Sequence, residues 1–398
     1  MTVLALFLAM LLPLLWAGVL LAFAGPLVAR WREPVLRHPV LIVESDDWGA
    51  GPLSQAAALT RLAAMLQRIR DRNGRAAVMT LGIVLEVPDG ARIAASRFAA
   101  YHALALADER FAAVRAAMQA GIEAGVFAPQ LHGQCHYWPA ALLAAARTDT
   151  AVRDWLATPE PAATEALPAP LQSRWIDASV LPSRALPGAA IGPAVAAETA
   201  AYRAVFGRLP QVAVATTFIW NEAVEAAWAQ AGVEVVITPG RRATCRNTAG
   251  QPACVDASML SGERSRAGPR YLVRDVYFEP SLGHAPQRLA DGLKLRARQG
   301  RACLVETHRF NFLQAEDASL AAFEAGLNAA VAACPRVRFL TPLELAHAIE
   351  KRDPAWIEGR LQRRLTVWCA RLDEIPRFRR IARLSGLTLP LACLGRAA

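Results

Sequence analysis

Three groups of acidic and histidine side chains directly follow stretches of apolar residues. Asp46 and Asp47 follow "PVLIV", His132 and His136 stand four residues apart in "QLHGQCHYW", and His308 lies in "VETHRFNF". Each group alone is more often a turn or a structural feature. Together, one carboxylate and two imidazoles form a donor set that binds a divalent metal ion and leaves positions open for water or substrate.

The adjacent carboxylates of Asp46 and Asp47 should repel each other at the end of a buried strand. A bound cation would offset that repulsion. A weaker fourth group, in "VRDVYFEPS", contains Arg274, Asp275 and Glu279. The pattern therefore predicts metal-assisted acid–base chemistry.

The residues around these groups predict alternating strands and helices. We expect strands at 39–45, 76–85, 126–133, 211–217, 233–238, 271–279, 302–308 and 337–341. We expect helices at 53–72, 109–125, 195–206, 221–231, 285–299, 317–334 and 342–351. This alternation predicts an α/β fold with parallel strands, and seven or eight such units favour a barrel. The carboxyl ends of the strands meet at one face of such a fold, so the three groups should converge.

The first 30 residues differ from the rest, because no charged residue precedes Arg30. The run is long enough to cross a bilayer as a helix, and it lacks the basic start and short apolar core of a cleaved signal peptide. We therefore expect an uncleaved transmembrane anchor at 1–30. Arg32 and Arg37 also follow it, and the positive-inside rule then places the catalytic domain on the cytoplasmic side of the inner membrane.

The cysteines also bear on which side of the membrane the domain lies. Seven cysteines, an odd number without a CxxC pair, fit a reducing compartment. Cys245 and Cys254 bracket a short polar loop and could form a disulfide if the domain lay outside the cytoplasm. This pair is the main argument against the cytoplasmic orientation.

The tail at 353–398 combines Arg with Trp, Phe, Leu and Ile at near-helical spacing. It predicts basic amphipathic helices that either lie in the plane of an anionic membrane or pack on the domain with Arg facing solvent. The net charge of +10 suits anionic lipid or phosphate-bearing partners. Nucleic acid is not expected, since the chain has no zinc finger, RNP-type motif or aromatic-basic stripe.

The order of the motifs resembles the polysaccharide deacetylases, the NodB-homology class or carbohydrate esterase family four. A strand before "SDDWG", a strand before "HGQCH" and a late strand ending in "THR" match the three motifs of that family in order. The resemblance implies a distorted (β/α)7–8 barrel over 38–352, in a divergent, membrane-anchored branch. It also implies a metal-dependent deacetylase that removes an N-acyl group from a sugar.

The resemblance assigns roles to individual residues. Asp47, His132 and His136 match the metal ligands of the family, and zinc is the favoured ion, with cobalt or another divalent ion as alternatives. Asp46 matches the general base that deprotonates a water molecule. His308 matches the general acid that protonates the departing amine.

The sequence departs from the family in two motifs. Gly133 stands where Ser or Thr usually follows the first histidine. The Arg-x-Pro motif that orients the catalytic Asp is absent, and the matching stretch reads "VATTFIW". Arg274, Arg241 or Arg242 could substitute for its arginine.

We assign substrate binding to Trp48, Arg274 and Glu279. The motif "DDWG" replaces "DDG", so the bulky Trp48 stands beside the site. It is expected either to stack on a sugar ring or to pack at the mouth of the barrel.

The favoured substrate is a lipid-linked or cell-envelope glycan precursor, because a domain on the cytoplasmic side would meet such an intermediate and not mature peptidoglycan. The basic tail would keep the site near anionic headgroups. One alternative is a non-catalytic carbohydrate-binding or scaffold protein on the same fold, which the missing Arg-x-Pro motif favours. Another is a periplasmic deacetylase of polymeric glycan, which a disulfide between Cys245 and Cys254 would favour.

Overall fold

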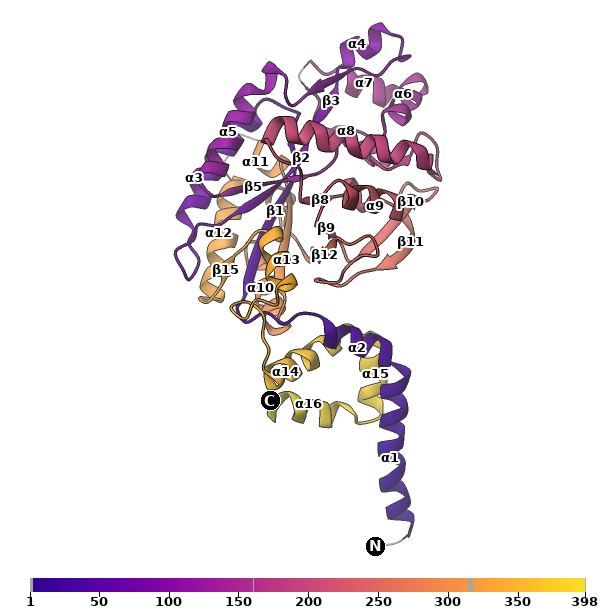
Figure 1. The fold of residues 1–398 in the computed structure, drawn as a ribbon, viewed down its shortest axis with the longest axis vertical. Coiled ribbons are helices and arrows are strands. Elements are labelled where there is room, and N and C mark those ends of the chain that lie inside the picture. Colours follow the sequence, from indigo (N-terminus) through magenta and orange to yellow (C-terminus); the bar gives the residue numbers. More distant parts are fainter. Residues whose placement is uncertain (1–2, 160, 314–317, 398) are drawn as a thin grey trace.

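The computed structural model describes residues 3–159, 161–313 and 318–397. A curled parallel sheet with helices around it forms the body of the molecule, and this confirms the expected α/β fold (Figure 1). The strands along the sheet are β12 (Arg270–Val273), β9 (Val235–Thr238), β8 (Val212–Val214), β5 (Phe127–Leu131), β2 (Met79–Val84), β1 (Val40–Gly49), β14 (Ala302–His308) and β13 (Val276–Tyr277). Neighbouring strands are parallel, and β15 (Arg338–Phe339) pairs with the start of β1.

The two ends of this sheet are consecutive in the chain. β12 and β13 lie at opposite ends of the strand order, yet only Arg274 and Asp275 separate them. The amide of Arg274 donates to the carbonyl of Thr238 on β9, and the amide of Asp275 donates to that of Leu304 on β14. The single strand expected at 271–279 is therefore broken. The chain changes strand partner at this point and so links the two edges of the curled sheet.

Helices cover the outer face of the sheet. They are α3 (Gln55–Arg68), α5 (Ala112–Glu123), α8 (Gly188–Phe206), α9 (Glu222–Gln230), α10 (Gln287–Arg298) and α12 (Ala318–Ala333). The helix α13 (Pro342–Glu350) instead packs on an apolar cluster inside the curl. Successive residues of β1 point alternately into two different apolar cores. Leu41 and Val43 join the core beneath the helices, whereas Val40 and Ile42 join an apolar cluster inside the curl. This alternation decides which later residues of β1 face the interior.

Smaller elements connect the strands. The short strands are β3 (Glu86–Pro88), β4 (Ala103–Ala105), β6 (Ile176–Asp177), β7 (Arg184–Ala185), β10 (Arg241–Arg246) and β11 (Pro252–Ser258). The short helices are α4 (Gly90–Ala95), α6 (Pro139–Thr148), α7 (Thr150–Leu156) and α11 (Phe310–Leu313). α4, α6 and α7 lie at the end of the body opposite the N-terminal helix (Figure 1). Cys245 and Cys254 form a disulfide between β10 and β11.

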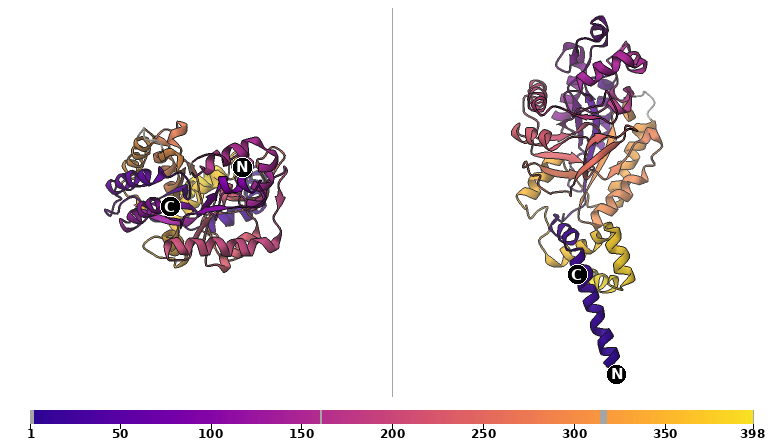
Figure 2. Two further views of the ribbon diagram at one scale, coloured as in Figure 1. Left: turned by 90° about the horizontal axis from the view of Figure 1, so that it is seen from above. Right: turned by 90° about the vertical axis from the view of Figure 1, so that its right-hand side faces the viewer.

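The N-terminal and C-terminal helices pack together at the other end. They are α1 (Val3–Ala22), α2 (Ala24–Arg32), α14 (Leu361–Arg371), α15 (Pro376–Leu384) and α16 (Thr388–Ala397). α1 projects away from the body in both side views (Figures 1 and 2). Val19, Leu27 and Phe378 belong to one apolar cluster that joins these helices. The fully buried Arg371 donates to the backbone carbonyl of Glu33, so the tail is fixed against the segment after α2.

The expected anchor at 1–30 forms two helices instead of one. Among the described residues, no single helix is both long and apolar enough to cross a membrane. Leu11–Ala22 and Ala24–Arg32 pass that test only as a pair, and their axes are bent by 68°.

Candidate active site

A bulge in β1 brings two consecutive carboxylates to one site. Asp46 lies on the same face of β1 as Ile42 and points into the curl, whereas Asp47 would point to the helices in a regular strand. The pairing of β1 with β2 shifts between Ser45 and Trp48, and Asp47 has a φ of 74°. The bulge therefore turns Asp47 toward the same site as Asp46.

Asp47 forms a buried group with two histidines. His132 directly follows β5, and His136 lies in the loop after it. The Oδ1 atom of Asp47 is 3.2 Å from Nε2 of His136 and 3.5 Å from Nε2 of His132, and these two nitrogens are 3.2 Å apart. Nδ1 of His132 lies 3.1 Å from the carbonyl oxygen of Val214, which can only accept a hydrogen bond. Nδ1 therefore carries the proton, and Nε2 presents its lone pair to the site.

These three side chains fit a divalent cation. One ligand atom from each lies within 4.8 Å of the others, and all three residues are buried. The buried Oδ1 of Asp47 has no hydrogen-bond donor among the described residues. Two imidazoles and one carboxylate form the donor set of a catalytic zinc site that keeps a position open. A cation bound here would supply the missing partner of Asp47.

Arg274 holds Asp46 from the other side. It donates from Nη2 to Oδ1 of Asp46 at 2.9 Å and from Nη1 to Oδ2, and its Nε donates to Glu44. Burial alone would raise the pKa of Asp46, but the charge of Arg274 outweighs it and lowers that pKa to about 2. Burial raises the pKa of Glu44 to about 7 against the opposing charge of Arg274. Asp46 is therefore ionised throughout the neutral range.

His308 lies beside Asp46 on the neighbouring strand, where the two residues are in register. Its Nδ1 donates to Oε1 of Glu279 at 2.5 Å, and Oε2 of Glu279 accepts from the hydroxyl of Thr307 at 3.0 Å and from Asn311. Burial would lower the pKa of His308, but the hydrogen bond to Glu279 and the charges of the two aspartates raise it to about 10. His308 is thus protonated at neutral pH, and 22% of its side chain is exposed.

The three residues assigned to substrate binding are all buried in the structure. Trp48 is fully buried, stacks on Phe312 and donates from Nε1 to the hydroxyl of Ser45. It packs in the core because the bulge moves it to the outer face of β1, so its ring offers no face to a sugar. Arg274 and Glu279 are also buried, and they hold Asp46 and His308 respectively.

These contacts show which arginine orients Asp46 in place of the missing Arg-x-Pro motif. Arg242 pairs with Glu225 and Asp256, and so does not contact Asp46. Arg274 makes two hydrogen bonds to Asp46 and has the orienting position for which the Arg-x-Pro motif was expected.

Two further residues near the site were not predicted. Arg309 is fully buried and donates from Nε and Nη2 to the two carboxylate oxygens of Glu165, at 3.0 and 2.7 Å. Its amide also donates to the carbonyl of Asp46. Arg309 directly follows His308 in "THRF", and this position in the motif could have indicated it as a residue near the site. Glu165 lies in the Pro- and Ala-rich connection 158–192, which has no periodicity to indicate it.

No protein-family model matches the chain, and no curated protein matches its sequence. Solved structures do match. A family 4 carbohydrate esterase from Streptomyces lividans, in complex with acetate, is 11% identical over 75% of this chain and 90% of its own, with a TM-score of 0.34. A protein from Mycobacterium smegmatis classed as a polysaccharide deacetylase is 11% identical over 80% of this chain and 96% of its own, with a TM-score of 0.38.

A 4-alpha-glucanotransferase from Thermococcus litoralis is 9% identical over 78% of this chain, with a TM-score of 0.40, and the match spans 40% of that enzyme. These scores are low, so the functional proposal depends on the side chains of the site alone. The chain resembles the polysaccharide deacetylases in the order and placement of its motifs, and solved structures described as members of that family are among its matches.

Proposed function

We propose that this chain is a metal-dependent hydrolase that removes an N-acyl group from a sugar. The observation that carries the proposal is the buried group of Asp47, His132 and His136, with the ionised Asp46 and the protonated His308 beside it. This is the complete set for amide hydrolysis: a cation site, a base and an acid.

The residues of the chain divide the reaction between them. Asp47, His132 and His136 would hold the cation, which supplies charge to polarise the amide carbonyl and activate water. Asp46 takes a proton from the attacking water, whose oxygen bonds to the carbonyl carbon. His308 gives a proton to the nitrogen as the C–N bond breaks, so the products are a carboxylic acid and the free amine.

The non-catalytic alternative loses its main support. It was suggested by the missing Arg-x-Pro motif, and Arg274 makes the contact to Asp46 that this motif was expected to make. A scaffold or binding protein would have no need for a buried base and acid in register on neighbouring strands.

Two observations favour a polymeric glycan outside the cytoplasm as a second candidate substrate. The disulfide between Cys245 and Cys254 is typical of oxidising compartments. The site also lies about 20 Å along β1 from its start at Val40, on the side away from α1. The helices expected to attach to the membrane lie on the other side of the body from this site. Such a site would reach a glycan polymer that extends away from the membrane more easily than a short sugar held at the membrane by its lipid.

Acetate release from an N-acetylated oligosaccharide tests the proposal. We expect Asp46→Asn and His132→Ala to lower the rate roughly 100- to 10,000-fold, while the exposed Asp291→Asn leaves it unchanged. Full activity in Asp46→Asn would remove its role as base. Sugar binding without acetate release by the metal-loaded wild type would favour the scaffold alternative.

A further inference from the structure

Two adjoining cavities lie at the opposite end of the molecule from the candidate active site, where α2 and the C-terminal helices meet the body. The first has a volume of about 530 Å³ and the second about 810 Å³. Arg32, Pro34 and Gly262 line both, so the two share a wall. Neither cavity contains a residue of the proposed catalytic group.

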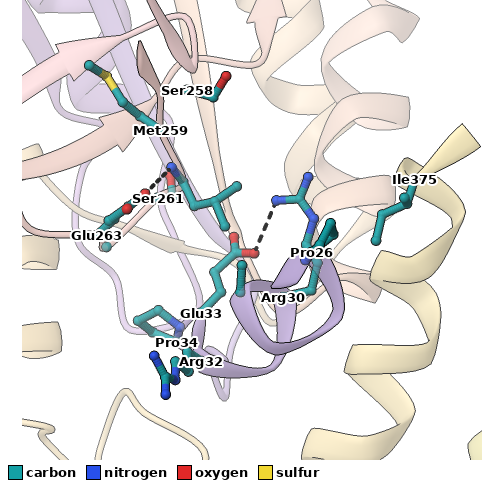
Figure 3. Close-up of a pocket in the computed structure, with 13 residues that line it drawn as sticks. Pro26, Arg30, Arg32, Glu33, Pro34, Ser258, Met259, Ser261, Glu263 and Ile375 are labelled. Atoms are coloured by element: carbon teal, nitrogen blue, oxygen red, sulfur yellow. Dashed lines mark hydrogen bonds and ion pairs between the residues drawn. The ribbon is translucent and has the colours of Figure 1, made fainter. Parts of the chain in front are cut away.

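The first cavity is mainly apolar. Pro26 and Ala29 of α2 line one side, and Met259, Leu260 and Ile375 contribute from the body and from the start of α15. Figure 3 shows Pro26 and Arg30 facing this space, with Ile375, the residue before α15, across from them. Arg30 is paired with Glu33 at 3.9 Å, so its charge is compensated within the wall.

The second cavity is strongly basic. Six arginines line it, against two carboxylates, at Glu350 and Glu358: Arg32, Arg37, Arg264, Arg270, Arg352 and Arg364. Glu350 is paired with Arg264 and Arg270, and Glu358 is paired with Arg37 and with Arg360 outside the cavity. Both carboxylates are therefore already neutralised.

Three of these arginines retain unused hydrogen-bond donors. The side chains of Arg32 and Arg352 make no hydrogen bond or ion pair with the described residues, and only the backbone amide of Arg352 donates, to the carbonyl of Ile349. Arg364 is held over the ring of Trp31 at 4.7 Å and donates to its carbonyl, but its buried Nε has no hydrogen-bond partner among the described residues. Uncompensated guanidinium groups around a cavity are the usual means of binding phosphate.

The surroundings indicate which kind of phosphate would fit. The helices α1, α14, α15 and α16, which pack with α2 next to the cavities, carry many of the exposed large apolar side chains among the described residues, such as Leu14, Leu21, Leu361, Leu384 and Leu389. An apolar cavity beside a basic one matches a molecule with an apolar chain and an anionic head. A soluble phosphate compound would use only the basic cavity.

We propose that the two cavities together bind one anionic phospholipid, with its phosphate among Arg32, Arg352 and Arg364 and its apolar part against Ala29, Leu260 and Ile375. This site is independent of the proposed deacetylase activity. It would fix the orientation of the molecule at a membrane through one bound lipid, in addition to the general attraction of a basic surface.

Titration of the detergent-purified full chain with phosphatidylglycerol or phosphatidylcholine, followed by native mass spectrometry, tests this site. We expect one phosphatidylglycerol per chain and weaker retention of phosphatidylcholine. Arg32→Gln combined with Arg352→Gln breaks no ion pair of the described structure and should weaken phosphatidylglycerol binding roughly 25-fold, about fivefold for each arginine. The matched control removes two exposed arginines elsewhere, Arg110→Gln with Arg208→Gln, and should leave binding unchanged.

A second variant separates lipid from soluble phosphate. Ala29→Trp should fill the apolar cavity and weaken lipid binding while all the arginines remain. Equal weakening by the two arginine pairs, equal retention of the two lipids, or displacement of the lipid by inorganic phosphate at comparable concentration would overturn the proposal. Acetate release from a soluble oligosaccharide should be the same in all these variants, so a failure of the lipid site can be distinguished from a failure of the proposed enzyme function.

Discussion

Asp46 and His308 carry opposite charges on neighbouring strands, and each charge is maintained by a buried partner. Arg274 keeps Asp46 ionised, and Glu279 keeps His308 protonated. A base and an acid that differ this far in pKa can both be in their working forms at one pH. The roles of the two residues therefore depend on side chains that do not reach the substrate.

Replacement of Glu279 by glutamine should change the pH dependence of the reaction. The amide still accepts hydrogen bonds but removes the carboxylate charge, so the pKa of His308 falls by roughly one to three units. Since His308 acts while protonated, activity is lost at a lower pH on the alkaline side. The measurement is the pH profile of acetate release, with the exposed Glu222→Gln as control. An unmoved alkaline limb in Glu279→Gln would show that another group sets it.

Arg274 should matter for stability as well as for activity. Arg274→Met leaves Glu44 and Asp46 buried without a cation, which costs about 3–5 kcal/mol in free energy of unfolding. The lowered pKa of Asp46 adds to the free energy of unfolding at any pH above 3.8, the ordinary pKa of an Asp side chain. This added stability disappears as the pH falls to about 2. Denaturant unfolding should therefore show a smaller difference from wild type in acid. A methionine variant as stable as wild type at neutral pH would contradict this role.

The bulge of β1 needs space on the next strand, and Gly82 of β2 provides it. A Cβ atom at this position would lie 2.3 Å from Oδ1 of Asp46. A glycine inside a strand often marks a close approach of this kind. The position of Asp46 thus depends on a residue that itself has no chemical group to contribute.

Gly82→Ala should displace Asp46 and lower acetate release roughly 100-fold, the effect of a shift of about 1 Å in a reacting group. Gly192→Ala is the matched control, because its added Cβ would meet no atom within 4 Å apart from the adjoining residues and backbone of α8 itself. It should not reduce activity. Wild-type rates in Gly82→Ala would mean that Asp46 can move without loss and is not the base.

The grouping of Asp47 with His132 and His136 could be predicted from sequence, because parallel strands bring their carboxyl ends together and place His132 near Asp47. Two other placements could not. "YLVRDVYFE" has the pattern of one unbroken strand, so the change of strand partner that points Arg274 at Asp46 gives no signal. A one-residue bulge reverses the faces of all later positions in a strand. Trp48 was expected to stack on a sugar ring or to pack at the mouth of the barrel, and it lies in the core instead.

The molecule as a whole has its N-terminal and C-terminal helices at one end, beyond the start of β1, whereas Asp46 and Asp47 lie near the other end of that strand (Figure 1). Two features point to opposite sides of a membrane. The arginines that follow the N-terminal apolar run predict the cytoplasmic side only if that run spans a membrane. The disulfide between Cys245 and Cys254 is typical of an oxidising compartment. The redox state of this pair in cells distinguishes the two.

We expect Cys245 and Cys254 to resist alkylation in acid-quenched cells until a reductant is added. Cys393 is exposed and free, so it should react without reduction and serves as the internal control. Mass spectrometry of the labelled peptides gives the result. Immediate labelling of both Cys245 and Cys254 would show that they are reduced and would favour the cytoplasmic orientation.

The most direct test of the proposed hydrolase is acetate release by the purified chain before metal removal, after it, and after zinc is returned. We predict that chelation abolishes release and that zinc restores it in the wild type but not in His136→Ala, because Asp47, His132 and His136 together form the cation site. Release that continues after measured loss of all bound metal would contradict the central claim, as would no release by the fully metal-loaded wild type.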